Sequence, residues 1–138
     1  MAHIIKKSPH VVDEVTIEDR DNTITLAVDI YVDDILADFN TNRKKLVEAK
    51  AAVEQLKASG DDVPPETMEN AYTSFVEASD ALFTMVFGAD QTKRILKSYG
   101  DRRLAMLRDF MPYFTGVILP EVQAAQKDLA DSYKSWGA

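Results

Sequence analysis

Side chains able to carry out chemistry are few in this sequence, and their spacing does not assemble a catalytic pair. The two histidines, His3 and His10, both fall within the first ten residues. We expect a flexible arm over residues 1–10, and such an arm lacks the rigid scaffold and the further ligand that a metal site needs. Cysteine is absent, so disulfides, thiolate metal sites and cysteine nucleophiles are excluded together.

Acidic and hydroxyl side chains gather in residues 66–80, but no histidine or basic side chain accompanies them to form an acid–base pair or to activate a nucleophile. These side chains are Glu66, Glu69, Ser74, Glu77, Ser79 and Asp80. The glycines that follow, Gly88 and Gly100, belong to no phosphate-binding loop motif. The sequence therefore predicts a protein with no enzymatic activity, no cofactor and no metal.

Charge and hydropathy narrow the classes of partner. The formal net charge is -7 and the sequence pI is about 4.8, which disfavours a nucleic acid because such binding depends on cationic side chains. The opening "MAHIIKKSPH" has no continuous apolar core of the kind found in signal peptides. The longest apolar run, "FMPYFTGVILP", is far shorter than the roughly 20 residues of a membrane span. We expect a soluble, intracellular protein that binds neither nucleic acid nor membrane.

The elements that must position any site begin with a β-hairpin over residues 11–31. The runs "VVDEVTIE" and "TITLAVDIY" are rich in β-branched residues and flank the turn-forming "DRDN". In the second run apolar and polar residues alternate with the period of two that is typical of a half-buried strand. Because an isolated hairpin is marginally stable in water, its apolar face must lie on helices or on another copy.

A helical bundle follows over residues 33–136, and together with the hairpin it makes one domain over residues 11–138. Apolar residues recur at steps of three and four from Ile35 to Leu56, which predicts one helix over residues 34–58. Further helices are expected over 65–87, 90–99 and 102–135, the last interrupted near Pro112 or Pro120. The predicted fold class is mainly α, with four to five helices after an N-terminal hairpin.

Charge is uneven along the chain. Residues 61–90 contain seven acids and no lysine or arginine, whereas residues 91–111 contain six bases and two acids. This pattern has two interpretations: neighbouring helices carry complementary solvated faces, or the molecule has a bipolar surface that steers a partner or a second copy. Together with the hairpin edge and the heptad-like stripe, it leads us to expect a homo-oligomer.

Two segments are apolar on more than one side, residues 82–87 and 110–119. One interpretation is that they form the centre of the bundle. The other is that part of this surface receives a helix of another protein, since methionine and aromatic side chains adapt to varied apolar partners. The candidate partner-binding residues are Phe83, Phe87, Phe110, Phe114 and Ile118.

The middle of the chain resembles the tail assembly chaperones of long-tailed bacteriophages, the small proteins encoded just upstream of the tape-measure protein. The residues that carry the resemblance are "ALFTMVFGADQTKRILKSYGD" and "MLRDFMPYFTGVILPEV". They give an apolar helix ending at Phe87 and Gly88, a short helix closed by Gly100, and a second apolar helix running to Val122. The order of elements matches over residues 24–125, and recognisable residues cover 81–122.

The resemblance implies a non-catalytic protein of the host bacterial cytoplasm. It implies binding to the tape-measure protein, which is kept soluble, recruitment of tail-tube protein, and absence from the mature virion. Two other functions remain open on the residues alone. One is a virion structural or connector-type protein whose hairpins pair in a ring, and the other is a small regulatory protein that uses the cluster between Lys93 and Arg108 on nucleic acid.

Overall fold

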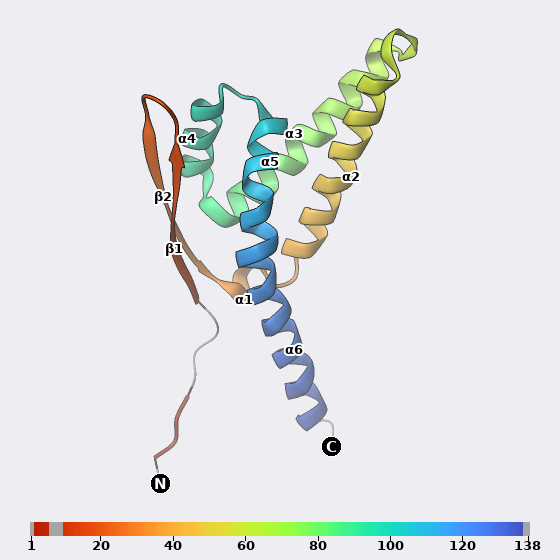
Figure 1. Cartoon of the computed structure of the whole chain (residues 1–138). Coiled ribbons are helices and arrows are strands. Elements are labelled where there is room, and N and C mark those ends of the chain that lie inside the picture. The colour runs from red at the N-terminus through yellow and green to blue at the C-terminus, as the bar shows by residue number, and fades with distance from the viewer. Residues whose placement is uncertain (1, 6–9, 137–138) are drawn as a thin grey trace.

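The computed structural model describes residues 2–5 and 10–136 and is mainly helical, with one two-stranded antiparallel sheet, as the sequence predicts. Residues 2–5 are exposed and have no regular secondary structure. The remainder of the expected arm, residues 1 and 6–9, lies outside the described residues. The chain then forms the hairpin, a pair of long helices, a short helix, and a long interrupted C-terminal helix (Figure 1).

The hairpin consists of β1 (His10–Glu18) and β2 (Thr23–Tyr31), paired in register from His10 opposite Tyr31 to Glu18 opposite Thr23. The turn between them is closed by a hydrogen bond from the Asp19 amide to the Asn22 carbonyl, 2.9 Å. One face is half-buried or buried and the other is exposed, in strict alternation along both strands. The period of two read from the sequence therefore marks the face that packs on the helices.

The helical part contains α1 (Val32–Ile35), α2 (Phe39–Ala58), η1 (Gly60–Asp62), α3 (Pro65–Phe87), α4 (Ala89–Tyr99), α5 (Arg103–Tyr113), η2 (Phe114–Ile118) and α6 (Leu119–Trp136). The expected single helix over 34–58 is wrong, because residues 36–38 form a turn between α1 and α2. Leu36 and Asp38 keep right-handed backbone angles there, so the three-and-four spacing continues across the break. None of these helices is long and apolar enough to span a membrane over the described residues.

The C-terminal helix is interrupted after Pro112, as its sequence predicts. Pro112 is the last but one residue of α5, and Phe114–Ile118 (η2) then have the wider π-helical turn before α6 begins. Proline has no amide hydrogen to donate to the preceding turn, and its ring clashes with that turn, so a helix is kinked or interrupted there. π-Helical turns are rare and occur mostly as single turns inside α-helices, as η2 does here. The helix therefore continues past the proline instead of ending at it.

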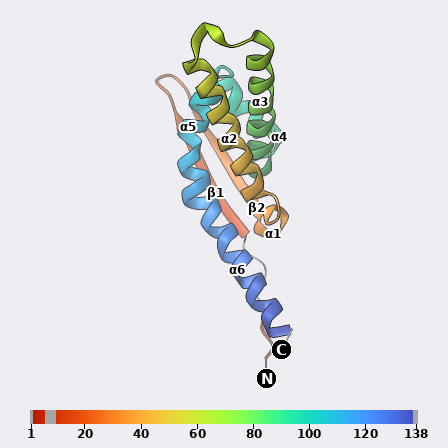
Figure 2. The same cartoon turned by 90° about the vertical axis from the view of Figure 1, so that its right-hand side faces the viewer.

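The elements form layers, with the hairpin on one side and the antiparallel pair α2–α3 on the other (Figures 1 and 2). Helices α4 and α5 lie between them, the tip of the α2–α3 pair projects beyond the rest, and α6 extends away from the body at the opposite end. At the α1–α2 break, the Gln126 side chain of α6 donates a hydrogen bond to the Leu36 carbonyl, 3.3 Å. This contact ties the C-terminal helix to the turn that the sequence did not predict.

The core is continuous from the hairpin to the two long helices. Its buried apolar side chains come from β2, from every α-helix and from η2. The largest fully buried ones include Leu26, Phe39, Leu46, Phe75, Phe83, Met106 and Phe114. The hairpin is thus an integral part of the core, which explains how a two-stranded sheet is stable in this chain.

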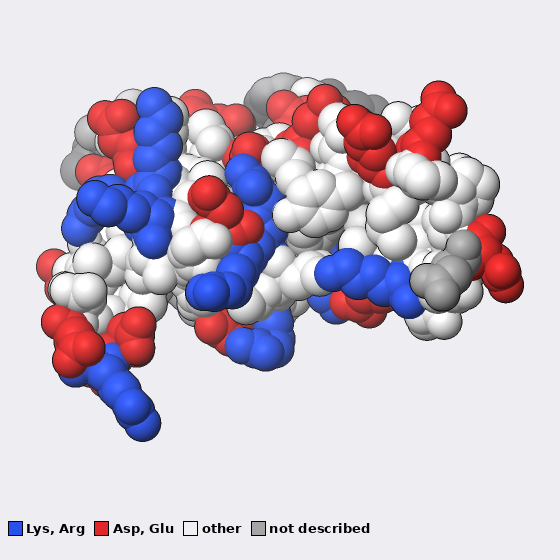
Figure 3. Space-filling model, turned by 90° about the horizontal axis from the view of Figure 1, so that it is seen from above, with Lys and Arg blue, Asp and Glu red and all other residues white. Residues whose placement is uncertain are grey.

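Among the side chains that the structure describes, the acidic and basic blocks of the sequence meet at one ion pair. Arg103 of α5 contacts Asp80 of α3, with 3.2 Å between Nε and Oδ1. Figure 3 shows that acidic and basic side chains are interspersed with uncharged ones on the upper surface, without one continuous field of either sign. On this face the two signs of charge lie close together, and both interpretations of the uneven charge pattern stay predictions.

Candidate helix-binding groove

The five residues predicted to bind a partner come together in space, but they form closed core and not surface. Phe83 and Phe87 on α3 meet Phe110 on α5, with ring centroids 5.2 and 5.5 Å apart. Phe114 and Ile118 on η2 complete the cluster, and all five side chains are between 0% and 4% exposed. These residues therefore form the centre of the bundle, the first of the two interpretations, and their binding to a partner stays a prediction.

The hairpin explains why these helices are apolar on more than one side. Ala27, Asp29 and Ile30 of β2 line the same hollow as the end of α3, and β1 lines another together with Phe110. The segments 82–87 and 110–119 thus face helices on one side and strands on the other. A one-sided apolar stripe suffices for a two-layer bundle, but this molecule has a third layer.

Two glycines turn the chain so that this cluster can form. Gly88 and Gly100 have positive φ angles of 81° and 58°, which glycine adopts without the steric cost that a Cβ atom imposes. Gly88 ends α3 and Gly100 ends α4. The short helix α4 therefore spans the gap between two helices whose phenylalanines face each other, as the glycine spacing predicts.

Two tyrosine–aspartate hydrogen bonds fasten the outer elements. The Tyr113 hydroxyl donates to Asp13 of β1, 3.0 Å, and the Tyr99 hydroxyl donates to Asp109, 2.8 Å. Burial, and then the hydrogen bond to Asp109, raise the pKa of Tyr99 to about 12. Burial and Asp13 likewise raise the pKa of Tyr113. Both phenols stay protonated at neutral pH and act as structural donors.

One of the two histidines occupies a different place from that expected. His10 is not in an arm: it begins β1, contacts the carboxylate of Asp29 and stacks on Tyr31 with ring centroids 4.1 Å apart. His3 lies in the exposed segment 2–5. Within residues 2–5 and 10–136 no group of three or more histidine, aspartate or glutamate side chains is arranged to hold a metal ion.

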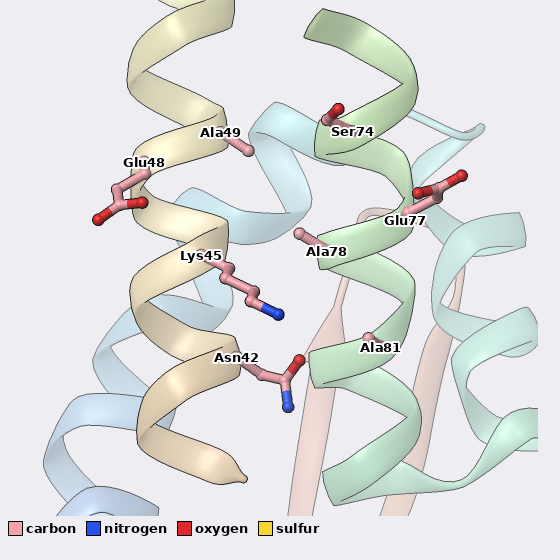
Figure 4. Close-up of a pocket in the computed structure, with 8 residues that line it drawn as sticks. All are labelled: Asn42, Lys45, Glu48, Ala49, Ser74, Glu77, Ala78 and Ala81. Atoms are coloured by element: carbon pink, nitrogen blue, oxygen red, sulfur yellow. The ribbon is translucent and has the colours of Figure 1, made fainter. Parts of the chain in front are cut away.

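An open groove with a volume of about 520 Å³ lies between α2 and α3 (Figure 4). Its lining residues are Asn42, Lys45, Glu48 and Ala49 of α2, and Ser74, Glu77, Ala78 and Ala81 of α3. The spacing of three and four places these residues on one side of each helix. The groove therefore runs along two antiparallel helices, on the side of the pair that faces solvent.

Small side chains form the middle of this groove. Ala49 and Ala78 point into the gap, whereas Glu48 and Glu77 point outward on either side (Figure 4). Ala81 also lines the groove. Lys45 extends its ammonium group into the gap and is the one cation among the lining residues. The alanines form an uncharged strip that lets the backbone of another chain approach closely. The polar residues of the lining can form contacts around it.

Sequence reasoning missed this groove. Its signal is present as Ser74, Ala78 and Ala81 at steps of four and three, on the face of α3 opposite to the phenylalanines. Small residues contribute little to an apolar stripe, so a search for large hydrophobic side chains passes over them.

Comparison of the chain with protein-family models, curated proteins and solved structures finds no match.

Proposed function

We propose that this protein is a tail assembly chaperone of a long-tailed bacteriophage, which binds a helix of the tape-measure protein in the α2–α3 groove. The observation that carries the proposal is the alanine strip of that groove, open to solvent along two antiparallel helices. The resemblance of residues 81–122 to this family supplies the identity of the client. The activity is binding without catalysis, and tail-tube protein is the second partner.

A helix is the occupant that fits this shape. Helices pack at interaxial distances of about 8–10 Å, and the smallest distances need small side chains at the contact. Ala49, Ala78 and Ala81 meet that need, so a client helix can lie between α2 and α3 as a third helix. An amphipathic helix docks through apolar side chains at successive turns, and each that enters the groove is removed from water.

Charge sets the expected character of the client helix. Lys45 reaches into the gap, while Glu48 and Glu77 flank it on the outer sides. A client with an acidic side chain near Lys45 and basic side chains at its margins complements this arrangement, because matched charges fix register and orientation. A long helical protein offers many such sites, so several copies of the chaperone can cover one client.

Co-expression tests the proposed function. The tape-measure protein encoded directly downstream is produced alone, with this protein, and with an unrelated small acidic helical protein as control. We expect the soluble fraction of tape-measure protein to rise with this protein only, and the two to copurify. An equally insoluble tape-measure protein in all three cases would refute the proposal. Recovery of this protein in stoichiometric amount from purified virions would favour the connector-type alternative.

A further inference from the structure

The two outer edges of the hairpin differ in whether the rest of the molecule forms hydrogen bonds with them. On β2 the Gln91 side chain of α4 imitates a neighbouring strand: its Oε1 accepts from the Ala27 amide, 2.7 Å, and its Nε2 donates to the Ala27 carbonyl, 2.6 Å. The same Nε2 also donates to the Phe87 carbonyl, 2.7 Å. The outer edge of β2, which faces away from β1, is therefore occupied at its centre by the Gln91 side chain.

The Gln91 contact also shows which backbone groups of β1 point outward. The amide and carbonyl of Ala27 point away from β1, and directly opposite residues of an antiparallel pair have the same orientation. Glu14 lies opposite Ala27, so the even-numbered residues of β1 direct their amides and carbonyls to the outer edge. These residues are His10, Val12, Glu14, Thr16 and Glu18.

This outer edge of β1 is largely unoccupied. Among the described residues, one hydrogen bond reaches it, from the Glu14 amide to the carboxylate of the adjacent Asp13, 2.8 Å. Residues 10–18 include no proline, lysine or arginine, the residues that most often prevent an edge strand from pairing with another chain. A nine-residue edge of this kind is a template for a further strand.

We propose that β1 pairs with β1 of a second copy, antiparallel and centred on Glu14, so that two hairpins form one four-stranded sheet. This register keeps the buried and exposed faces aligned. It places Val11 opposite Ile17 of the second copy on the inner face, and His10 opposite Glu18 on the outer face. The contact is two-fold symmetric, which is the commonest way for identical chains to associate. It does not depend on the proposed function.

A hollow beside β1 supports this occupant. It has a volume of about 220 Å³ and lies between residues 15–18 of β1 and the side chains of Tyr99, Asp109, Phe110 and Tyr113. In the proposed register Val11 of the second copy lies next to Ile17, on the face that borders this hollow. Two-fold symmetry fills the equivalent hollow of the second copy in the same way, so each strand contributes backbone hydrogen bonds and one apolar contact.

Glu14 provides a test of the register that leaves the hairpin intact. In the proposed dimer the two Glu14 side chains face each other directly, and like charges in that position weaken strand pairing. Glu14→Gln removes the repulsion and keeps the shape of the side chain. We expect the dimer of this variant to be roughly two- to fivefold tighter than that of the wild type.

Substitutions of Thr16 on β1 and Thr25 on β2 test whether the outer edge of β1 forms the dimer contact. They lie opposite each other in the hairpin, both are exposed, and both direct their amides away from the partner strand. Proline removes an amide hydrogen at either position without breaking the β1–β2 ladder. In sedimentation from about 1 to 100 µM, we expect Thr16→Pro to weaken the dimer by roughly tenfold or more, whereas Thr25→Pro leaves it within about twofold of wild type.

Each result decides the proposal. A wild-type protein that stays monomeric over this range overturns it, as does equal weakening by both proline variants. Circular dichroism reports whether Thr16→Pro is folded. If that variant does not fold, Glu14→Gln decides: a tighter dimer supports pairing centred on Glu14, and an unchanged dissociation constant overturns it.

Discussion

Replacing Phe83 with alanine removes a fully buried ring from the centre of the aromatic cluster. The Phe83 side chain is 0% exposed, and its ring centroid lies 6.1, 5.2 and 5.0 Å from those of Phe87, Phe110 and Phe114. Truncation of a buried phenylalanine costs about 3–5 kcal/mol, because the transfer free energy of the ring is lost and a cavity remains. For 138 residues this lowers Tm by about 10–17 °C.

Urea unfolding followed by circular dichroism measures this loss in the free energy of unfolding. Tyr72→Ala is the matched control, because Tyr72 is an aromatic residue of the same helix that is 41% exposed. We expect this control to cost about 1 kcal/mol or less. If Phe83→Ala costs no more than Tyr72→Ala, the ring is not part of a packed core, and the second interpretation, an apolar surface that receives a partner helix, would be favoured.

Three further predictions concern the strand edge, the glycine turns and one tyrosine. Gln91→Glu keeps the side-chain shape but replaces its amide donor with an oxygen that faces two backbone carbonyls, so we expect urea unfolding to show a loss of about 1–3 kcal/mol. Gly100→Ala should cost about 1 kcal/mol because φ is +58° there. Gly116→Ala should instead stabilise by about 0.5–1 kcal/mol, since it lies in a helical segment with nothing within 4 Å of an added Cβ. Tyr99, whose pKa is raised from 10.0 to about 12 by burial and by Asp109, should stay protonated in the folded state while the unfolded state ionises. Stability should therefore fall between pH 10 and pH 12, and ultraviolet titration of the phenol should show the late ionisation.

The glutamine and glycine predictions have matched controls, and all three have a contradicting outcome. Gln123→Glu makes the same change at an exposed position of α6, and an equal loss there would contradict the strand contact of Gln91. Equal effects of alanine at Gly100 and Gly116 would contradict the assignment of strain to the positive φ angle. Ionisation of Tyr99 near its ordinary pKa of 10.0 would show that its burial and its hydrogen bond do not persist in solution.

The sequence was sufficient to predict most elements of the fold. The hairpin follows from alternation in "TITLAVDIY", and α3 and α4 follow from the proline at the start and the glycines at the ends. The break between α1 and α2 was not predictable from spacing, because residues 36–38 retain near-helical backbone angles at both ends. The apolar stripe therefore passes through the turn unchanged.

The role of the phenylalanines depends on the packing of the hairpin against the helices, which the spacing of apolar residues along the chain does not reveal. Apolar residues on two sides of residues 82–87 fit an open groove or a three-layer core equally well. The hairpin decides between them, since it lies against the end of α3 and beside Phe110. The α2–α3 groove was missed for a different reason: it consists of alanines and a serine, and its depth exists only once both helices are placed.

The most direct test of the central claim is the affinity of the α2–α3 groove for a client helix. The dissociation constant of a purified helical segment of the tape-measure protein is measured by calorimetry for wild type, Ala81→Trp and Ala124→Trp. Ala81 is an exposed alanine in the groove, and Ala124 is an exposed alanine on α6. An indole at position 81 keeps the client helix from approaching α3 closely. Ala81→Trp should therefore weaken binding about tenfold or more, which is about 1.4 kcal/mol. Ala124→Trp should leave binding within about twofold. Equal affinity of both folded variants, or no binding by the wild type, would contradict the account.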